Sequence, residues 1–277
     1  MKDKICLVTG ATSGIGEASA QALAAMSATV IVGARNEEKA KATVAKIRAQ
    51  SGNDNVEYLI ADLSVQAQVR DLAKQVEARY PRLDVLLNNA GGMYMLRHES
   101  ADGIELVWAT NHLNYFLLTH LLLPMVKKSA AGRIVNVASR AHFSGSINFD
   151  DLQHKNGYSP MKVYGQSKLA NVLFTRELAK RLDGSKVTVN AVHPGLVATS
   201  FAQNSKFAKL IGKLVLRGAR SSEKGAETLV YLASSPEVER ISGEYFYDKK
   251  VAHSSSESKD MEIAARLWQV SAEMVWI

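Results

Sequence analysis

The sequence predicts an α/β fold in which a doubly wound parallel sheet of about seven strands carries helices on both faces. Two observations support this prediction. Strand-like and helix-like segments alternate along the chain, and the strand-like segments are short and apolar at nearly every position, as in strands buried on both faces. No internal repeat, low-complexity tract or linker interrupts this pattern, so we expect residues 1–277 to form one domain.

The first half of the chain supplies four strand–helix pairs. In order, they are an apolar strand at 5–9, an alanine-rich helix at 14–27, a β-branched strand at 28–33, a charged helix at 36–51, a strand at 56–60, a helix at 65–79, a strand at 83–88 and a helical stretch at 102–129. Apolar residues recur every three to four positions in the helices, which is the amphipathic period.

The second half continues the alternation. In order, it contains a strand at 133–138, a helix at 160–182, a strand at 186–192, a helix at 222–234, a strand at 244–247 and a final helix at 260–275. The last part of the chain, about 248–277, is expected to be a C-terminal extension that covers the site or an interface.

The composition indicates a soluble globular protein, because 47% of the 277 residues are hydrophobic and 22% are charged. No apolar run reaches the roughly 18 residues of a membrane span, and no signal-peptide cleavage site follows Met1. Cys6 is the only cysteine, which excludes an internal disulfide and favours a cytoplasmic location. The net charge of +7 is compatible with a phosphorylated ligand. Without zinc-finger spacing, an RNA-binding aromatic motif or a basic tail, no nucleic-acid partner is expected.

A glycine-rich turn follows the first strand. Its glycines have the spacing G-x-x-x-G-x-G, and a helix begins within it. Backbone N–H groups and the helix N-terminus of such a turn face an anion, so the turn predicts a Rossmann-type dinucleotide site. The alternative is a tight strand–helix connection without a ligand. The expected cofactor contacts are Gly10, Thr12, Ser13, Gly14, Ile15 and Gly16.

The ends of the next two strands carry polar residues. Arg35 follows the second strand, where an acidic residue would bind the ribose hydroxyls of NAD and an arginine suits the 2′-phosphate of NADP. Arg35 therefore favours NADP(H) over NAD(H), although it could also be a surface arginine at a helix start. Asp62 and Leu63 follow the third strand and are expected near the adenine, while Asp62 could instead cap the helix at 65.

Tyr164 and Lys168 lie four residues apart in the helix at 160–182, so their side chains share one face. A phenol has a pKa of about 10 in water, which is too high for efficient acid–base work at neutral pH. A neighbouring ammonium favours the phenolate, so we expect Lys168 to lower the pKa of Tyr164. The alternative is that both side chains lie on a solvated helix face.

Three further motifs complete a set with this pair. They are Asn88-Asn89-Ala90-Gly91 after the fourth strand, Ser139 after the fifth and Pro194-Gly195 after the sixth. In order and along nearly the full chain, this set resembles the short-chain dehydrogenase/reductase family. The resemblance implies a single Rossmann domain and hydride transfer between a nicotinamide and a carbonyl or alcohol carbon.

The resemblance also implies roles for individual residues. Tyr164 is similar to the general acid of reduction and base of oxidation, and Lys168 to the residue that tunes it and holds the nicotinamide ribose. Ser139 resembles the hydrogen-bond donor to the substrate oxygen. Asn111 resembles a member of the proton relay, although an asparagine within a helix can also be a local hydrogen-bond former. Further cofactor contacts implied by the resemblance are Asn89, Ala90, Gly91, Pro194, Gly195, Val197 and Thr199.

Within the family, the chain resembles the retinol dehydrogenase-type branch. The resemblance lies in Arg140–His142, Ile147–Leu152, Tyr164–Leu178, Tyr245–Val251 and Arg266–Trp268. It implies an NADP(H)-dependent enzyme that interconverts apolar aldehydes or ketones, such as retinal, and their alcohols. A reductase of steroid or other polycyclic ketones is an alternative. A catalytically silent dinucleotide-sensing regulator is another, but such a protein would be expected to lack Ser139, Tyr164 or Lys168.

The segment 200–220 is variable in character, with apolar and basic stripes at helical spacing. It could be a lid over an apolar substrate, a peripheral membrane contact through residues 206–220, or an ordinary surface helix. Met93, Tyr94 and Met95 are candidates to line the pocket for the apolar substrate that such a lid would cover. The seven histidines lack the spacing of metal ligands, so no metal is expected. His112 and His193 are expected to be structural, whereas His142, three residues past Ser139, could touch the substrate. The resemblance makes a homodimer or homotetramer possible.

Overall fold

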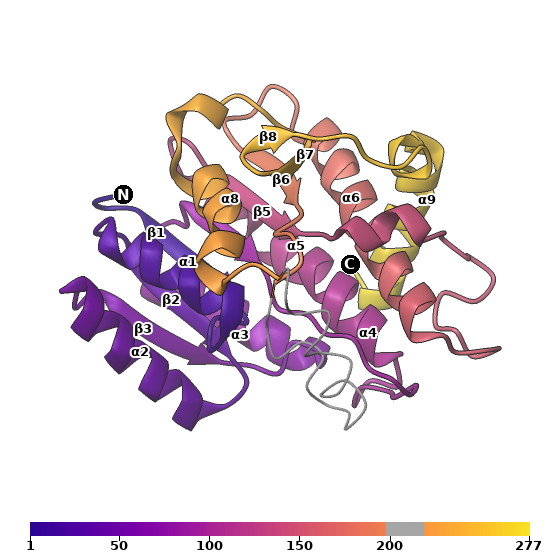
Figure 1. Ribbon diagram of the computed structural model, residues 1–277, viewed down its shortest axis with the longest axis horizontal. Helices are drawn as coiled ribbons and strands as arrows, with labels where there is room; N and C mark the ends of the chain where they lie inside the picture. Colours follow the sequence, from indigo (N-terminus) through magenta and orange to yellow (C-terminus); the bar gives the residue numbers. More distant parts are fainter. Residues whose placement is uncertain (198–218) are drawn as a thin grey trace.

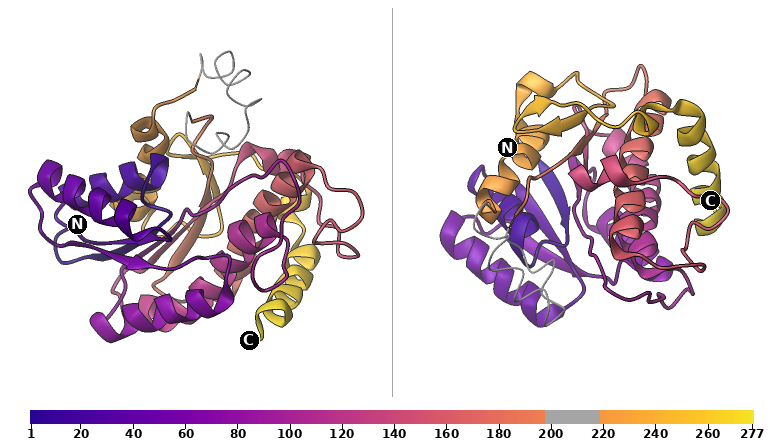
Figure 2. Two further views of the ribbon diagram at one scale, coloured as in Figure 1. Left: turned by 90° about the horizontal axis from the view of Figure 1, so that it is seen from below. Right: turned by 45° about the vertical axis from the view of Figure 1, so that its right-hand side comes forward.

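The computed structural model describes residues 1–197 and 219–277, and it contains one eight-stranded sheet (Figures 1 and 2). The strands run in the order β3-β2-β1-β4-β5-β6-β7-β8. Their bounds are β1 Ile5–Thr9, β2 Thr29–Ala34, β3 Val56–Ile60, β4 Val85–Asn88, β5 Arg133–Val137, β6 Thr188–Val192, β7 Tyr245–Tyr247 and β8 Lys250–Val251. Strands β1 to β7 pair in parallel, as predicted, while β8 pairs antiparallel with β7 and exceeds the expected number of about seven.

Helices cover both faces of the sheet. Their bounds are α1 Gly14–Ala25, α2 Glu37–Ser51, α3 Gln66–Arg79, α4 Leu106–Trp108, α5 Asn114–Lys127, α6 Pro160–Arg181, α8 Ser222–Ser234 and α9 Met261–Val275. One core contains the strand side chains that face α1, α2 and α8, and the other contains those that face α3, α5, α6 and α9. Figure 2 shows α9, in yellow, alongside α6 and away from α1, α2 and α8.

Strand β1 shows how the two cores arise from alternation. Cys6 and Val8 are fully buried on the side of α1 and α8, whereas Leu7 is fully buried on the side of α3 and α5. A strand covered on both faces must be apolar at successive positions, which is why this segment lacks a polar–apolar alternation. Burial also raises the pKa of the Cys6 thiol, which is a small side chain in this core.

The helical stretch expected at 102–129 is divided in the structure. The helix begins only at Leu106, because the buried carboxylate of Glu105 accepts hydrogen bonds from the backbone N–H groups of Val107 and Trp108, at 2.9 and 2.7 Å. A π-helical turn, Ala109–Leu113, then separates α4 from α5. Such a turn frees backbone groups from the regular ladder and is common at functional sites.

Strands β1 and β4 are neighbours in the sheet, and the order in which successive strands are added reverses at this point. Loops that leave the carboxyl ends of β1, β4, β5 and β6 therefore meet at one edge of the sheet, which is where open α/β sheets bind ligands. No helix within the described ranges is long and apolar enough to cross a membrane.

Candidate active site

The glycine-rich turn after β1 is shaped by close backbone contacts. A Cβ atom on Gly16 would lie 2.4 Å from the Gly10 carbonyl oxygen, so only glycine fits there. Gly10 itself has a φ of +64°, and a Cβ on it would lie 2.8 Å from the Cα of Ala90. Ser13 is the N-cap of α1, but its side chain accepts no capping hydrogen bond, so the first N–H groups of the helix are left for a ligand. These features fit a dinucleotide phosphate group.

The turn is held in place by Asn89 and Thr9. The Asn89 Nδ2 atom donates to the carbonyl oxygens of Thr9 and Gly10, at 2.9 and 3.2 Å. The Thr9 hydroxyl accepts from the backbone N–H groups of Asn89 and Ala90, at 2.9 and 3.1 Å. The Asn89 side chain therefore shapes the phosphate turn from behind. Thr9 was not among the predicted site residues, although its position directly before Gly10 was a usable signal.

Arg35 lies at the end of β2, directly beside this turn, because the N–H of Gly10 donates to the Gly33 carbonyl at 2.9 Å. Its side chain is exposed and forms no hydrogen bond or ion pair with the residues that the structure describes. A solvated, unpaired guanidinium next to a phosphate-binding turn can bind a second phosphate group.

Asp62 and Leu63 follow β3, and the side chains of both residues contact other parts of the protein. The Asp62 carboxylate accepts from the backbone N–H and the hydroxyl of Ser64, at 3.0 and 2.7 Å. It therefore closes the turn ahead of α3, and the helix N-cap is Val65, so the suggested capping role is wrong. The Leu63 side chain is buried in the core beside α3 and α5, which leaves mainly its backbone to a ligand.

The four predicted catalytic residues come together from three segments. Tyr164 and Lys168 lie one turn apart on α6, and Ser139 follows β5 and hydrogen-bonds the Tyr164 hydroxyl. The Lys168 ammonium lies 5.6 Å from the centroid of the Tyr164 ring and donates to the Val137 carbonyl at 3.0 Å.

Asn111 lies in the π-helical turn and reaches across to this group. Its side chain accepts from the Gly92 N–H at 2.8 Å and donates to the Gly92 carbonyl and the Ser167 hydroxyl, both at 3.0 Å. A Cβ on Gly91 would lie 2.9 Å from the Asn111 Oδ1 and 3.6 Å from the Lys168 Nζ, so the loop after β4 passes against both side chains. Asn111 therefore ties this loop to α6 and is not a merely local hydrogen-bond former.

Burial dominates the acid–base properties of the group. It raises the pKa of Tyr164 to about 12, and the hydrogen bond from Ser139 only partly opposes this increase. It lowers the pKa of Lys168, which is only 3% exposed, to about 7. The expectation that Lys168 lowers the pKa of Tyr164 is therefore wrong, because desolvation of the phenol sets the direction of the shift.

Comparison with known proteins identifies the family. The family description "short chain dehydrogenase" matches residues 4–209. Retinol dehydrogenase 12 from Mus musculus is 41% identical over 274 residues, which cover 99% of this chain and 87% of the relative. Retinol dehydrogenase 14 from Homo sapiens is 41% identical over 292 residues, with coverage of 99% and 87%. The chain belongs to the short-chain dehydrogenase/reductase family.

Solved structures agree with this assignment. An uncharacterised protein from Mycobacterium paratuberculosis superposes with a TM-score of 0.81 at 34% identity, covering 99% of this chain and 94% of that protein. RhlG from Pseudomonas aeruginosa, in a complex with NADP, superposes with a TM-score of 0.72 at 28% identity, covering 89% and 94%. This short-chain dehydrogenase/reductase is thus an oxidoreductase, for which a nicotinamide dinucleotide is the typical cofactor.

The segment after β6 completes the edge of the short-chain dehydrogenase/reductase site. Gly195 has a φ of +89°, and a Cβ on it would lie 2.8 Å from the Arg220 side chain. The Arg220 backbone N–H donates to the Leu196 carbonyl at 2.8 Å, and Val197 forms an isolated parallel bridge with Arg220. Residues Pro194–Val197 are therefore held from the side by Arg220. Thr199 lies outside the described residues, as does most of the expected lid and membrane-contact segment.

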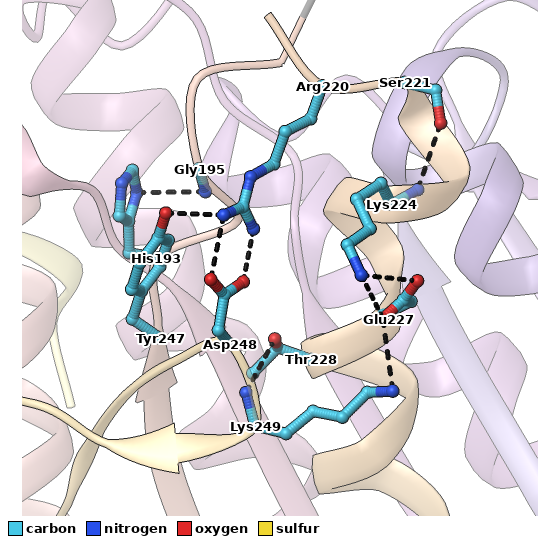
Figure 3. Close-up of polar contacts among 10 residues, drawn as sticks. All are labelled: His193, Gly195, Arg220, Ser221, Lys224, Glu227, Thr228, Tyr247, Asp248 and Lys249. Carbon is cyan, nitrogen blue, oxygen red and sulfur yellow. Dashed lines mark hydrogen bonds and ion pairs between the residues drawn. The ribbon is translucent and has the colours of Figure 1, made fainter.

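Arg220 is fixed in turn by the β7–β8 turn (Figure 3). Its guanidinium forms an ion pair with Asp248 and donates to the Tyr247 hydroxyl at 2.6 Å. The His193 ring stacks on Tyr247 at 5.1 Å, and its Nδ1 accepts from the Gly195 N–H at 3.3 Å. Arg220 belongs to the basic stripe of the segment 200–220, and in the structure it clamps this edge of the site.

Residues 1–197 and 219–277 contain no group of three or more His, Cys, Asp or Glu side chains that could bind a metal ion. His193 contacts Tyr247 and the Gly195 backbone, which is in line with the structural role expected for it.

Proposed function

We propose that this protein is an NADP(H)-dependent oxidoreductase that interconverts an apolar aldehyde or ketone, of the retinal type, and its alcohol. The observation that carries the proposal is the contact among Ser139, Tyr164 and Lys168 at the carboxyl edge of the sheet, beside a glycine-rich turn that fits a dinucleotide. The names of the relatives, retinol dehydrogenases 12 and 14, favour a lipophilic substrate.

The state of Tyr164 favours carbonyl reduction at neutral pH. With a pKa of about 12, its hydroxyl is protonated and can donate its proton to the substrate oxygen. Ser139 donates a hydrogen bond to the same oxygen and stabilises the negative charge that develops there. When bound, the nicotinamide supplies the hydride for the carbonyl carbon. A protonated Lys168 beside Tyr164 would stabilise the phenolate that remains.

An apolar substrate is supported by exposed apolar side chains on the loop after β4 and at the start of α6, the segments that also carry Gly91 and Tyr164. Met95 and Leu96, in the loop after β4, and Met161, at the start of α6, are all exposed. The Tyr158 hydroxyl donates to the Tyr94 carbonyl at 2.8 Å, which brings this loop and the start of α6 together. Exposed methionine and leucine side chains next to a polar site are suited to an irregular apolar ligand.

The choice of NADP(H) is supported by Arg35. It is an exposed cation beside the phosphate turn, and RhlG, a structural neighbour, was solved with NADP. Arg35→Asp should lower the preference for NADPH over NADH by at least about tenfold, because it replaces a phosphate-binding cation with an anion. An unchanged ratio of kcat/KM for the two cofactors would contradict this role.

The decisive experiment is a set of initial rates with NADPH and NADH against retinal, long-chain aldehydes, quinones and steroid ketones. Turnover of retinal or aldehydes with NADPH supports the proposal, and turnover of steroid ketones alone would favour a polycyclic-ketone reductase. Tight NADPH binding without turnover of any carbonyl would favour a dinucleotide-sensing regulator. A cytoplasmic location, a homodimer or homotetramer and membrane contact through 206–220 stay predictions, which fractionation, light scattering and vesicle sedimentation can test.

A further inference from the structure

Two buried histidines connect the catalytic group to the C-terminal part of the chain. His112 and His142 both have 0% of their surface exposed, and neither belongs to the catalytic set. Each hydrogen-bonds a residue near the catalytic group through Nδ1 and a residue beyond position 250 through Nε2. The partner atoms determine which atom donates in each of these hydrogen bonds, because a backbone N–H can only donate and a carbonyl can only accept.

His142 links Ser139 to the C-terminal segment. Its Nε2 lies 3.1 Å from the backbone nitrogen of Ser255, and a backbone N–H can only donate, so Nε2 must be unprotonated. The proton is then on Nδ1, which donates to the Ser139 carbonyl at 2.7 Å. The ring packs against Tyr245 at 4.7 Å, which fixes its plane.

His112 is linked to Asn111 and Lys168 through hydrogen bonds of Asn171. The Asn171 Nδ2 donates to the carbonyl of Asn111 at 2.9 Å and to that of Val137 at 3.2 Å. Val137 is also the carbonyl that accepts from the Lys168 ammonium. Asn171 follows Lys168 by three residues on α6, so it lies on the same helix face.

The amide of Asn171 determines the tautomer of His112. Because its Nδ2 faces two carbonyls, its Oδ1 must accept, and it does so from the His112 Nδ1 at 3.3 Å. The His112 Nε2 is then an acceptor, and the Ser271 hydroxyl on α9 donates to it at 2.9 Å. Burial lowers the pKa of His112 to about 4 and also lowers that of His142, which keeps both rings neutral at physiological pH.

We propose that His112 and His142 are positioning residues through which the C-terminal residues 255–271 hold Ser139, Asn111 and Lys168 in their catalytic arrangement. Both rings present Nδ1–H to the catalytic side and an unprotonated Nε2 to the C-terminal side. The C-terminal extension thus becomes part of the active-site framework and more than a cover. The kinetic part of this inference rests on the proposed function.

Paired substitutions separate positioning from general stability. An asparagine amide reaches about as far as Nδ1 of a histidine, and a glutamine amide about as far as Nε2. His142→Gln and His112→Gln should therefore lose the catalytic-side contact, whereas His142→Asn and His112→Asn should keep it. We expect kcat to fall by about tenfold to a hundredfold in the glutamine variants and by about threefold in the asparagine variants, since small misplacements of catalytic groups are costly. The KM for NADPH should change little.

Asn190→Ala provides a matched control. Asn190 is also buried and also binds residues near the C-terminus, through the Ile241 carbonyl at 2.6 Å and the Glu244 N–H at 3.1 Å, but it does not contact the catalytic group. It should lower the midpoint of thermal unfolding without changing kcat. If kcat falls equally in the glutamine and asparagine variants, or falls to the same extent in Asn190→Ala, the histidines only support the fold and the proposal is wrong.

A second measurement does not depend on turnover. The nitrogen-15 spectrum of the histidine-labelled protein should show both rings as neutral Nδ1–H tautomers between about pH 7 and pH 8, because burial lowers both pKa values from the ordinary 6.5. Ser271→Ala should alter the signals of His112 and leave those of His142 unchanged. Nε2–H tautomers in the wild type would overturn the proposal. Wild-type protein that turns over no carbonyl would refute the proposed function instead, and the spectrum would still decide the positioning.

Discussion

The glycine-rich turn and the catalytic end of α6 lie at the same edge of the sheet but are built in opposite ways. The turn is made of backbone, within eight successive residues from Thr9 to Gly16, and its shape depends on missing side-chain atoms. The catalytic end is made of buried or half-buried side chains from separate segments, which hydrogen bonds to one another or to neighbouring residues hold in place. One half of the site is therefore local in sequence and the other is tertiary.

This difference has consequences for energetics. A backbone turn binds an anion through N–H groups that need no change in charge, so its residues carry no perturbed pKa. The catalytic end buries an amine and a phenol, and burial shifts the pKa of Lys168 down to about 7 and that of Tyr164 up to about 12. Stability is therefore lost at the catalytic end in exchange for reactive groups, a common feature of active sites.

The largest expected effect comes from a substitution that alters only the catalytic side chains. Tyr164→Phe keeps the ring against Lys168 but removes the proton donor, so kcat should fall by about 10²–10⁴-fold. The Kd for NADPH, measured by fluorescence titration, should stay within about threefold because the turn is untouched. Tyr231→Phe, which removes a hydroxyl on α8 that donates to Glu237, should leave both quantities unchanged. Wild-type turnover in Tyr164→Phe would contradict the assigned role.

An intermediate effect is expected from a substitution in the glycine-rich turn. Gly16→Ala places a Cβ 2.4 Å from the Gly10 carbonyl and 2.5 Å from the Asn89 Nδ2, so the turn must open. Such overpacking costs about 1–3 kcal/mol, which corresponds to roughly a tenfold or greater increase in the Kd for NADPH. Gly52→Ala is the control, because Gly52 has a φ of +67° but no atom within 4 Å of an added Cβ. It should cost stability without changing the Kd, and equal Kd values for both variants would show that the close contact is not needed.

The smallest effect concerns the stability cost of Lys168. Burial lowers the pKa of Lys168 from 10.5 to about 7, so between these pH values the unfolded chain binds more protons than the folded protein. The free energy of unfolding therefore rises with pH across this window, and the cost is greatest below pH 7. Lys168→Met should stabilise the ligand-free protein by about 0.5–2 kcal/mol near pH 6, and the gain should shrink as the pH approaches 10.5.

Thermal unfolding at pH 6 and pH 9 measures this effect. Lys74→Met, which alters a largely solvated lysine on α3, should change the unfolding midpoint equally at both pH values. A gain in Lys168→Met that is as large at pH 9 as at pH 6 would mean that the burial of charge is not its source.

Local sequence patterns were enough to predict the alternating order of strands and helices, the turn from Gly10 to Gly16 and the pairing of Tyr164 with Lys168. Each of these depends on neighbours within about one helical turn or one strand. The segment 250–251 could not be recognised as a strand, since two residues carry no period. The late start of α4 also escaped prediction, because it depends on the burial of a single carboxylate, that of Glu105.

How the catalytic groups are held and charged depends on contacts between segments that lie far apart in the sequence. The high pKa of Tyr164 results from burial by distant segments, which a motif does not contain. The partners of His142 and His112 beyond position 250 lie 113 and 159 residues away in the chain. Local patterns record which face of an element is buried, whereas the position of a proton or a charge depends on whatever the fold packs around it.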